Sequence, residues 1–145
     1  MPGPKEPTLK YGVTCEKILF EKDNVISLIR IVDKFILTLA GPQLPESLPP
    51  GQMALNIAMC WVGGLGTHEA ALNIIRPDGT VHQSNQTWPF TLDSLNSGHT
   101  IAATEVIEIS GAGTYWIEFV LNGSSRNRIP FQIIYQRRQM RNPKA

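Results

Sequence analysis

The sequence predicts an all-β protein, a single antiparallel β-sandwich of Greek-key, immunoglobulin-like type with about eight or nine strands. Three observations predict this class. Apolar residues alternate with period two in several segments, as in strands whose side chains leave opposite faces. These segments recur at intervals of about 8–14 residues, as is typical of sandwiches and barrels. Turn signals separate them, among them Pro77-Asp78-Gly79 and Asn122-Gly123.

The first segment of the chain predicts a flexible lead followed by a hairpin. Residues 1–10, MPGPKEPTLK, are expected to form the lead, before a sandwich domain at 11–136 and a basic tail at 137–145. The stretch YGVTCEKILFE is predicted to be a strand that pairs with the run after the turn signal Lys22-Asp23-Asn24.

That next run, VISLIRIVDKFILTLA, fits a helix as well as a strand, because its apolar residues also form one helical stripe. Its many β-branched residues favour a strand, since they lose χ1 freedom in a helix. We therefore predict a strand, broken near Asp33-Lys34. The proline-rich stretch 41–51, GPQLPESLPPG, is expected to be a crossover loop between the sheets.

The middle of the chain predicts a central strand and several shorter ones. Alternation from Met53 to Trp61 indicates the central strand, and EAALNIIR is expected to return antiparallel to it after a glycine turn. Three further strands are predicted around Thr80–His82, Trp88–Phe90 and Ile101–Ile109.

The last predicted element is a hairpin from Gly113 to Tyr135, turning at Asn122-Gly123. Pro130 has no N–H to donate, so its strand is expected to be an edge or to be bulged there. Tyr115, just after a glycine-rich turn, resembles the tyrosine corner of Greek-key sandwiches; an ordinary half-buried core tyrosine fits equally well.

Several of these segments resemble a family of small bacterial proteins that is catalogued only as a domain of unknown function. The Cys15-Glu16 pair, SLIRIVD, the proline-rich loop, GTH, RPDGT and GTYWIEFVLNG occur in that order, and the similarity spans about Cys15 to Tyr135. The resemblance implies a strand-rich fold and a bacterial or phage protein. It names no catalytic residue.

Composition is that of a globular protein, with 42% apolar and 17% charged residues and a net charge of +1. No apolar run is long enough to span a bilayer as a helix, and no signal peptide is recognised, so we expect a cytoplasmic protein. The cysteines Cys15 and Cys60 do not make a disulfide framework and are expected to stay reduced.

No catalytic motif, metal set or cofactor motif is recognised, and the protein is predicted not to be an enzyme. His68, His82 and His99 have separations that match no ligand pair on one element. Glu105 and Glu108 have an odd spacing, which places them on opposite faces of one strand, so they cannot flank a scissile bond together.

The sequence therefore favours a binding module that acts on a macromolecular partner or on itself. A homodimer interface is predicted to contain Trp116, Pro130, Phe131, Ile133 and Tyr135. The second hypothesis is a carbohydrate or nucleotide site on Trp88 and Trp116, whose indole rings can stack on ligands. The third is an enzyme of an unrecognised type.

The C-terminal basic segment adds one electrostatic hypothesis. Its arginines could contact an anion such as nucleic acid, or could be solvated residues that aid solubility, which the sequence favours. The candidate anion contacts are Arg126, Arg128, Arg137, Arg138 and Arg141.

Overall fold

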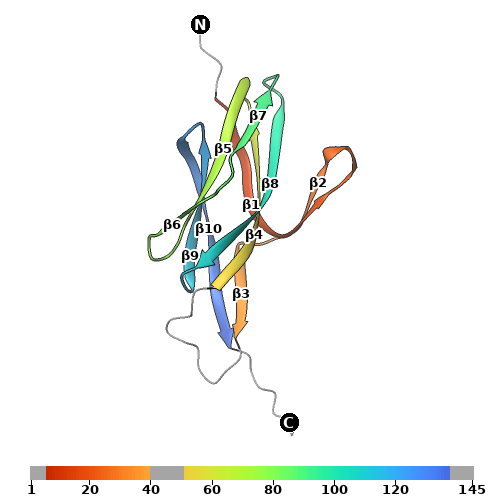
Figure 1. Cartoon of the computed structure of the whole chain (residues 1–145). Helices are drawn as coiled ribbons and strands as arrows, with labels where there is room; N and C mark the ends of the chain where they lie inside the picture. The colour runs from red at the N-terminus through yellow and green to blue at the C-terminus, as the bar shows by residue number, and fades with distance from the viewer. Residues whose placement is uncertain (1–5, 40–50, 138–145) are drawn as a thin grey trace.

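Two β-sheets pack face to face in the computed structural model, which describes residues 6–39 and 51–137 (Figure 1). The described residues form ten strands: β1 (Thr8–Phe20), β2 (Ile26–Ile31), β3 (Lys34–Leu39), β4 (Gly51–Val62), β5 (Gly66–Ile75), β6 (Val81–Gln83), β7 (Trp88–Leu92), β8 (Gly98–Ile109), β9 (Gly113–Leu121) and β10 (Ser124–Arg137). The only helical element described is a short 3₁₀ turn, η1 (Lys22–Asn24). The predicted all-β sandwich is confirmed.

The strand order explains how the chain crosses between the layers. The four-stranded sheet has the order β2-β1-β4-β8. The six-stranded sheet has the order β3-β10-β9-β5-β6, with β7 also paired to β5. All pairings are antiparallel except that of β3 with β10, which is parallel.

The ambiguous run at 25–39 forms strands, and it breaks where the sequence predicted. β2 ends at Ile31 and β3 begins at Lys34, and the two strands belong to different sheets. The break is fixed by backbone hydrogen bonds to both layers. Val32 N donates to Thr14 O at 3.0 Å, and Gln132 N donates to Asp33 O at 2.8 Å. This division of one run into two strands raises the number to ten, above the eight or nine predicted.

The core fills the space between the sheets with the inward side of each alternating strand. Trp61, at the end of the stripe predicted for β4, is fully buried, and its indole Nε1 donates to Met59 Sδ. The largest fully buried side chains are Trp61, Tyr115, Phe119, Phe131, Leu55, Ile57, Met59, Leu72, Ile74, Ile107, Ile117 and Leu121. Both sheets contribute to this set, so one hydrophobic core holds the layers together.

The terminal hairpin is confirmed, and so is the tyrosine corner at its start. Asn122 and Gly123 both have positive φ, 50° and 81°, as a twist-compatible hairpin turn requires. The Tyr115 hydroxyl donates to Gly111 O at 2.6 Å and accepts from Ser110 N at 3.1 Å. The phenol therefore ties β9 back to the turn that precedes it.

Pro130 lies on a stretch of β10 that is an edge, as predicted, although β10 as a whole is not. Residues 124–131 pair only with β9, whereas β3 covers the other side of β10 from Gln132 onward. The N–H of Gln132 points toward β3, and Pro130, two residues earlier, presents its nitrogen on the same side. The missing donor thus faces the open part of the edge.

Three predicted boundaries shift. β1 begins at Thr8, which pairs with Val62, so the lead expected at residues 1–10 is too long. The crossover loop predicted at 41–51 lies outside the described residues except for Gly51, which opens β4. The predicted tail overlaps β10 at Arg137, and residues 138–145 lie outside the described part.

Candidate protein-binding surface on the six-stranded sheet

The outer face of the six-stranded sheet carries one continuous row of apolar side chains. Trp116 on β9 lies opposite Pro130 on β10 and opposite Ile75 on β5, and Ile75 lies opposite Val81 on β6. Residues directly opposite each other share a face, so these four side chains form one row, here called the outer row. At about 4.8 Å between strands, the row is roughly 14 Å long.

The outer row faces solvent because the alternation of β9 puts its neighbours inside. Tyr115 and Ile117, on either side of Trp116, are fully buried in the core. Trp116 itself is 41% exposed and Val81 is 50% exposed. A large aromatic ring left partly in water, within an apolar row, is typical of protein interfaces.

A polar row runs beside the outer row, one pleat along the same face. Glu118 on β9 lies opposite Asn73 on β5 and Arg128 on β10. Asn73 Nδ2 donates to Glu118 Oε1 at 3.0 Å, and Arg128 donates to Oε2 through Nε at 3.0 Å and Nη2 at 2.8 Å. The hydrogen bond from Asn73, and then Arg128, lower the pKa of the Glu118 carboxyl, although desolvation opposes them. Its charge is thereby fixed in place beside the apolar row.

The interface predicted from the sequence is corrected by this arrangement. Trp116 and Pro130 do lie on the outer face, next to each other. Phe131 and Ile133 are fully buried in the core, and Tyr135, on the same side of β10, packs partly against that core. The prediction was wrong for Phe131 and Ile133 because both sides of β10 carry apolar residues, and the sequence alone does not show which side is inward.

The two tryptophans proposed as a ligand platform do not come together. Trp88 lies opposite Ala70, which is fully buried, and packs against the core from the inner side of the six-stranded sheet. Trp116 lies on the outer side of the same sheet. A single sugar or base could not stack on both rings.

The basic residues predicted as anion contacts are partly neutralised by carboxylates. Arg126 pairs with Glu6, and Arg128 pairs with Glu118. The side chain of Arg137, and Arg138 and Arg141 as a whole, lie outside the described residues. Anion binding by this segment therefore stays a prediction without support from Arg126 and Arg128.

Two of the three histidines, His68 and His99, contact the same ring, that of Phe90, whereas His82 lies against a carboxylate. His82 Nε2 lies 3.0 Å from Glu105 Oε1 across the two sheets. His68 Nε2 donates to Leu65 O at 2.9 Å, which leaves Nδ1 to accept from Asn122 Nδ2 at 3.1 Å. The His99 ring stacks on Phe90 with centroids 5.1 Å apart.

Chemistry-bearing side chains are dispersed over the part of the chain that the structure describes. In residues 6–39 and 51–137, no group of three or more His, Cys, Asp or Glu side chains is placed to hold a metal ion. Glu105 is buried and Glu108 is exposed, so the predicted opposite orientation of these two residues is confirmed. The thiols of Cys15 and Cys60 are free and buried, and desolvation raises the pKa of Cys15.

Two members of the outer row were missed by the sequence analysis. Ile75 follows the inward residue Ile74, so the alternation of that segment does place it on the outer face. Val81 sits on a strand of only three residues, too short for alternation to define a face. The sequence does not determine the register, that is, which residues of neighbouring strands lie opposite each other. Only the structure shows that Val81, Ile75, Trp116 and Pro130 are paired across four strands.

The chain was compared with protein-family models and with curated proteins, and neither comparison found a match. In the described residues, no helix has the length and apolar character needed to cross a membrane.

Proposed function

We propose that this protein is a non-catalytic β-sandwich module that binds another protein chain through the outer row of its six-stranded sheet. The observation that carries the proposal is the continuity of that row, which crosses four strands and is centred on the half-exposed Trp116. Tryptophan at the centre of a flat apolar patch is the residue type most often found to dominate binding energy.

The neighbouring polar row supports recognition of a specific partner. Asn73 and Arg128 hold the Glu118 carboxylate in one position, so a partner would meet a fixed charge pair beside an apolar strip. Such an arrangement matches the apolar centre and polar surround of protein interfaces. It suits a protein surface better than a sugar, since among the described residues the outer row offers no aromatic ring besides that of Trp116 to stack against a ligand.

We also propose that the sandwich is immunoglobulin-like. The Tyr115 corner, with its hydroxyl bound to Gly111 O, supports this assignment, because that motif marks the strand after the E–F turn in immunoglobulin-like domains. The cytoplasmic location and the bacterial or phage origin expected from the sequence stay predictions.

Site-specific photo-cross-linking tests the binding surface. A photoreactive amino acid replaces Val81 in the full chain, which is then irradiated in a lysate of the native host, and covalent adducts are identified by mass spectrometry. We expect one dominant protein adduct that is lost when Trp116→Glu is added, with the melting temperature nearly unchanged because Trp116 is surface-exposed.

Val106→Glu is the matched control, since Val106 is 55% exposed on the outer face of the other sheet. It should leave the adduct intact. An adduct that survives Trp116→Glu, or that is lost equally with Val106→Glu, would contradict binding through the outer row.

A further inference from the structure

The turn between β9 and β10 is tied to β5 through Asn122. The backbone N of Asn122 donates to Glu69 O at 2.8 Å, and its side-chain Oδ1 accepts from Glu69 N at 2.9 Å. The side-chain Nδ2 lies 3.1 Å from His68 Nδ1. The ladder between β9 and β5 reaches only to the pair of Leu121 and Ala70, so these contacts extend it by one residue. His68 and Asn122, with the backbone groups that they bind, are called the latch.

The position of each hydrogen in the latch is determined by its partner. The backbone N–H of Glu69 can only donate, so the atom of the Asn122 amide that faces it is the oxygen. The NH₂ group of Asn122 therefore faces His68 Nδ1, which must accept. On the other side of the ring, the carbonyl oxygen of Leu65 can only accept, so His68 Nε2 donates to it, at 2.9 Å. The latch thus holds His68 as a neutral imidazole with its hydrogen on Nε2.

A second proton on His68 would break the latch. An imidazolium carries hydrogen on both nitrogens, so Nδ1–H would point at the NH₂ group of Asn122. Turning the amide over does not solve the conflict, because its NH₂ group would then face the N–H of Glu69. One hydrogen bond of the Asn122 side chain is lost in either arrangement. His68 is only 9% exposed, so water does not readily replace the lost partner.

The aromatic groups that pack on His68 offer its proton no acceptor. Phe90 on β7 lies against the imidazole, with ring centroids 5.7 Å apart. His99 on β8 stacks on the other side of Phe90, with centroids 5.1 Å apart. A proton on His99 would add a second positive charge beyond the phenyl ring, and it would therefore oppose the charging of His68.

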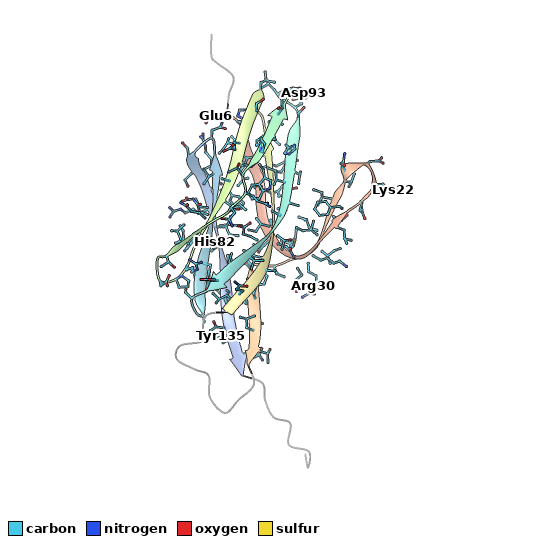
Figure 2. All side chains as sticks on the ribbon, viewed as in Figure 1. Glu6, Lys22, Arg30, His82, Asp93 and Tyr135 are labelled. Atoms are coloured by element: carbon cyan, nitrogen blue, oxygen red, sulfur yellow. The ribbon has the colours of Figure 1, made fainter. Side chains whose placement is uncertain are left out.

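The acidic groups on the neighbouring elements have other partners or point elsewhere. Glu69, next to His68 on β5, alternates to the exposed outer face of the sheet. Glu6 and Asp93 both lie at one end of the sandwich in Figure 2. Glu6 pairs with Arg126, and Asp93 accepts a hydrogen bond from Ser97. Among the residues that the structure describes, no ion pair includes His68.

We propose that the latch is a pH-sensitive switch, in which protonation of His68 releases the β9–β10 turn from the beginning of β5. The released state binds one proton more than the closed state, so acid favours release. A histidine in water takes up its proton as the pH falls through about 6.5, so the latch is closed at neutral pH and weakens below that value. The latch shares no residue with the outer row, and the switch does not depend on binding there.

Hydrogen exchange of the full chain, followed by NMR, tests the switch. The reporters are the amide hydrogens of Glu69 and Asn122, which both donate within the latch. Their protection, relative to an unstructured chain at the same pH, should fall roughly five- to tenfold from pH 7.5 to 5.5. The imidazole nitrogen shifts at pH 7.5 should show His68 with its hydrogen on Nε2. The other tautomer, or unchanged protection at pH 5.5, overturns the proposal.

Asn122→Asp distinguishes a switch from a contact that is merely structural. Both oxygens of the new carboxylate accept, so it can bind the N–H of Glu69 and a protonated His68 at the same time. Aspartate also tolerates the left-handed φ of 50° at this position. Acid should therefore strengthen the latch of this variant, and the protection of Glu69 should rise between pH 7.5 and 5.5. A fall as large as that of wild type would overturn the proposal.

Two glutamine variants assign the pH dependence to one histidine. His68→Gln has no group that titrates in the latch, so the protection of Glu69 should no longer change between pH 7.5 and 5.5, whatever its absolute value. His99→Gln is the matched control on the other side of Phe90, and it should keep the fall seen in wild type. A fall that survives His68→Gln, or that disappears with His99→Gln, would assign the effect to another group and overturn the proposal.

Discussion

His82 on β6 and Glu105 on β8 meet between the two sheets, with Nε2 of the histidine 3.0 Å from Oε1 of the glutamate. Both side chains are largely buried, at 21% and 11% exposure. His82→Ala should lower the free energy of unfolding by about 1.5–3 kcal/mol, because the buried carboxylate then lacks its partner. Urea denaturation measures the loss.

Replacing both partners of this pair should lower the free energy of unfolding by less than the sum of the two single replacements. The double variant His82→Leu with Glu105→Leu buries no polar group, and such apolar replacements are often neutral. A double-mutant cycle with additive single and double losses would show that the two residues are not coupled.

Gly12 on β1 lies directly beneath the Phe119 ring. A Cβ atom at this position would lie 2.4 Å from Phe119 Cζ, and the Phe119 side chain is fully buried in the core. Gly12→Ala should therefore lower the free energy of unfolding by about 1–3 kcal/mol, as overpacked cores do. Gly51→Ala is the control, since a Cβ there meets nothing within 4 Å. Equal stability of the two variants would disprove the close contact.

Tyr115→Phe removes the hydroxyl that joins Gly111 O and Ser110 N. We expect a loss of about 1–2 kcal/mol, because a partly buried donor and acceptor lose their partner. Tyr11→Phe removes a single hydrogen bond to Thr100, at 3.3 Å, and should cost less. Thermal or urea unfolding compares the two, and a larger loss at Tyr11 would mean that the corner does not stabilise the fold.

Glu118 should contribute a pH-dependent part of the stability. Its pKa is lowered in the folded protein by Asn73 and Arg128, so its charged form stabilises the fold at any pH above the unfolded pKa, about 4.3. This contribution is lost as the pH falls through the folded pKa. The stability difference between wild type and Glu118→Gln should be constant from pH 8 to about pH 5 and should shrink below about pH 4. A difference that persists unchanged to pH 2.5 would contradict the assignment.

Alternation and turn chemistry were sufficient to predict most of the strands. Asn122-Gly123 and Pro77-Asp78-Gly79 both occupy turns, and the β-branched run at 25–39 forms strands that break next to Asp33. These features are local, so a single sequence contains them. The alternation of side chains along β9 also predicts that Trp116 lies on the face opposite to Tyr115 and Ile117, and these two are buried in the structure.

Features that depend on contacts between distant residues could not be predicted in the same way. Phe131 and Ile133 alternate with Gln132 and Ile134, and only the packing of the second sheet shows that the former pair is buried. In β2, adjacent apolar residues at Leu28 and Ile29 leave neither face polar, so alternation alone does not show which face is inward. Strand order, and the parallel pairing of β3, have no local signature at all.

The parallel pairing of β3 with β10 has a consequence for how the chain is made. Lys34 emerges from the ribosome early, but its partner Gln132 is synthesised nearly a hundred residues later. Until then, β3 has no strand to pair with, and its backbone groups and the apolar side chains of Phe35 and Leu37 stay open to other chains. Translation of the last strand is thus the event that closes the six-stranded sheet, and a ribosome that stalls before residue 132 leaves that edge without its cover.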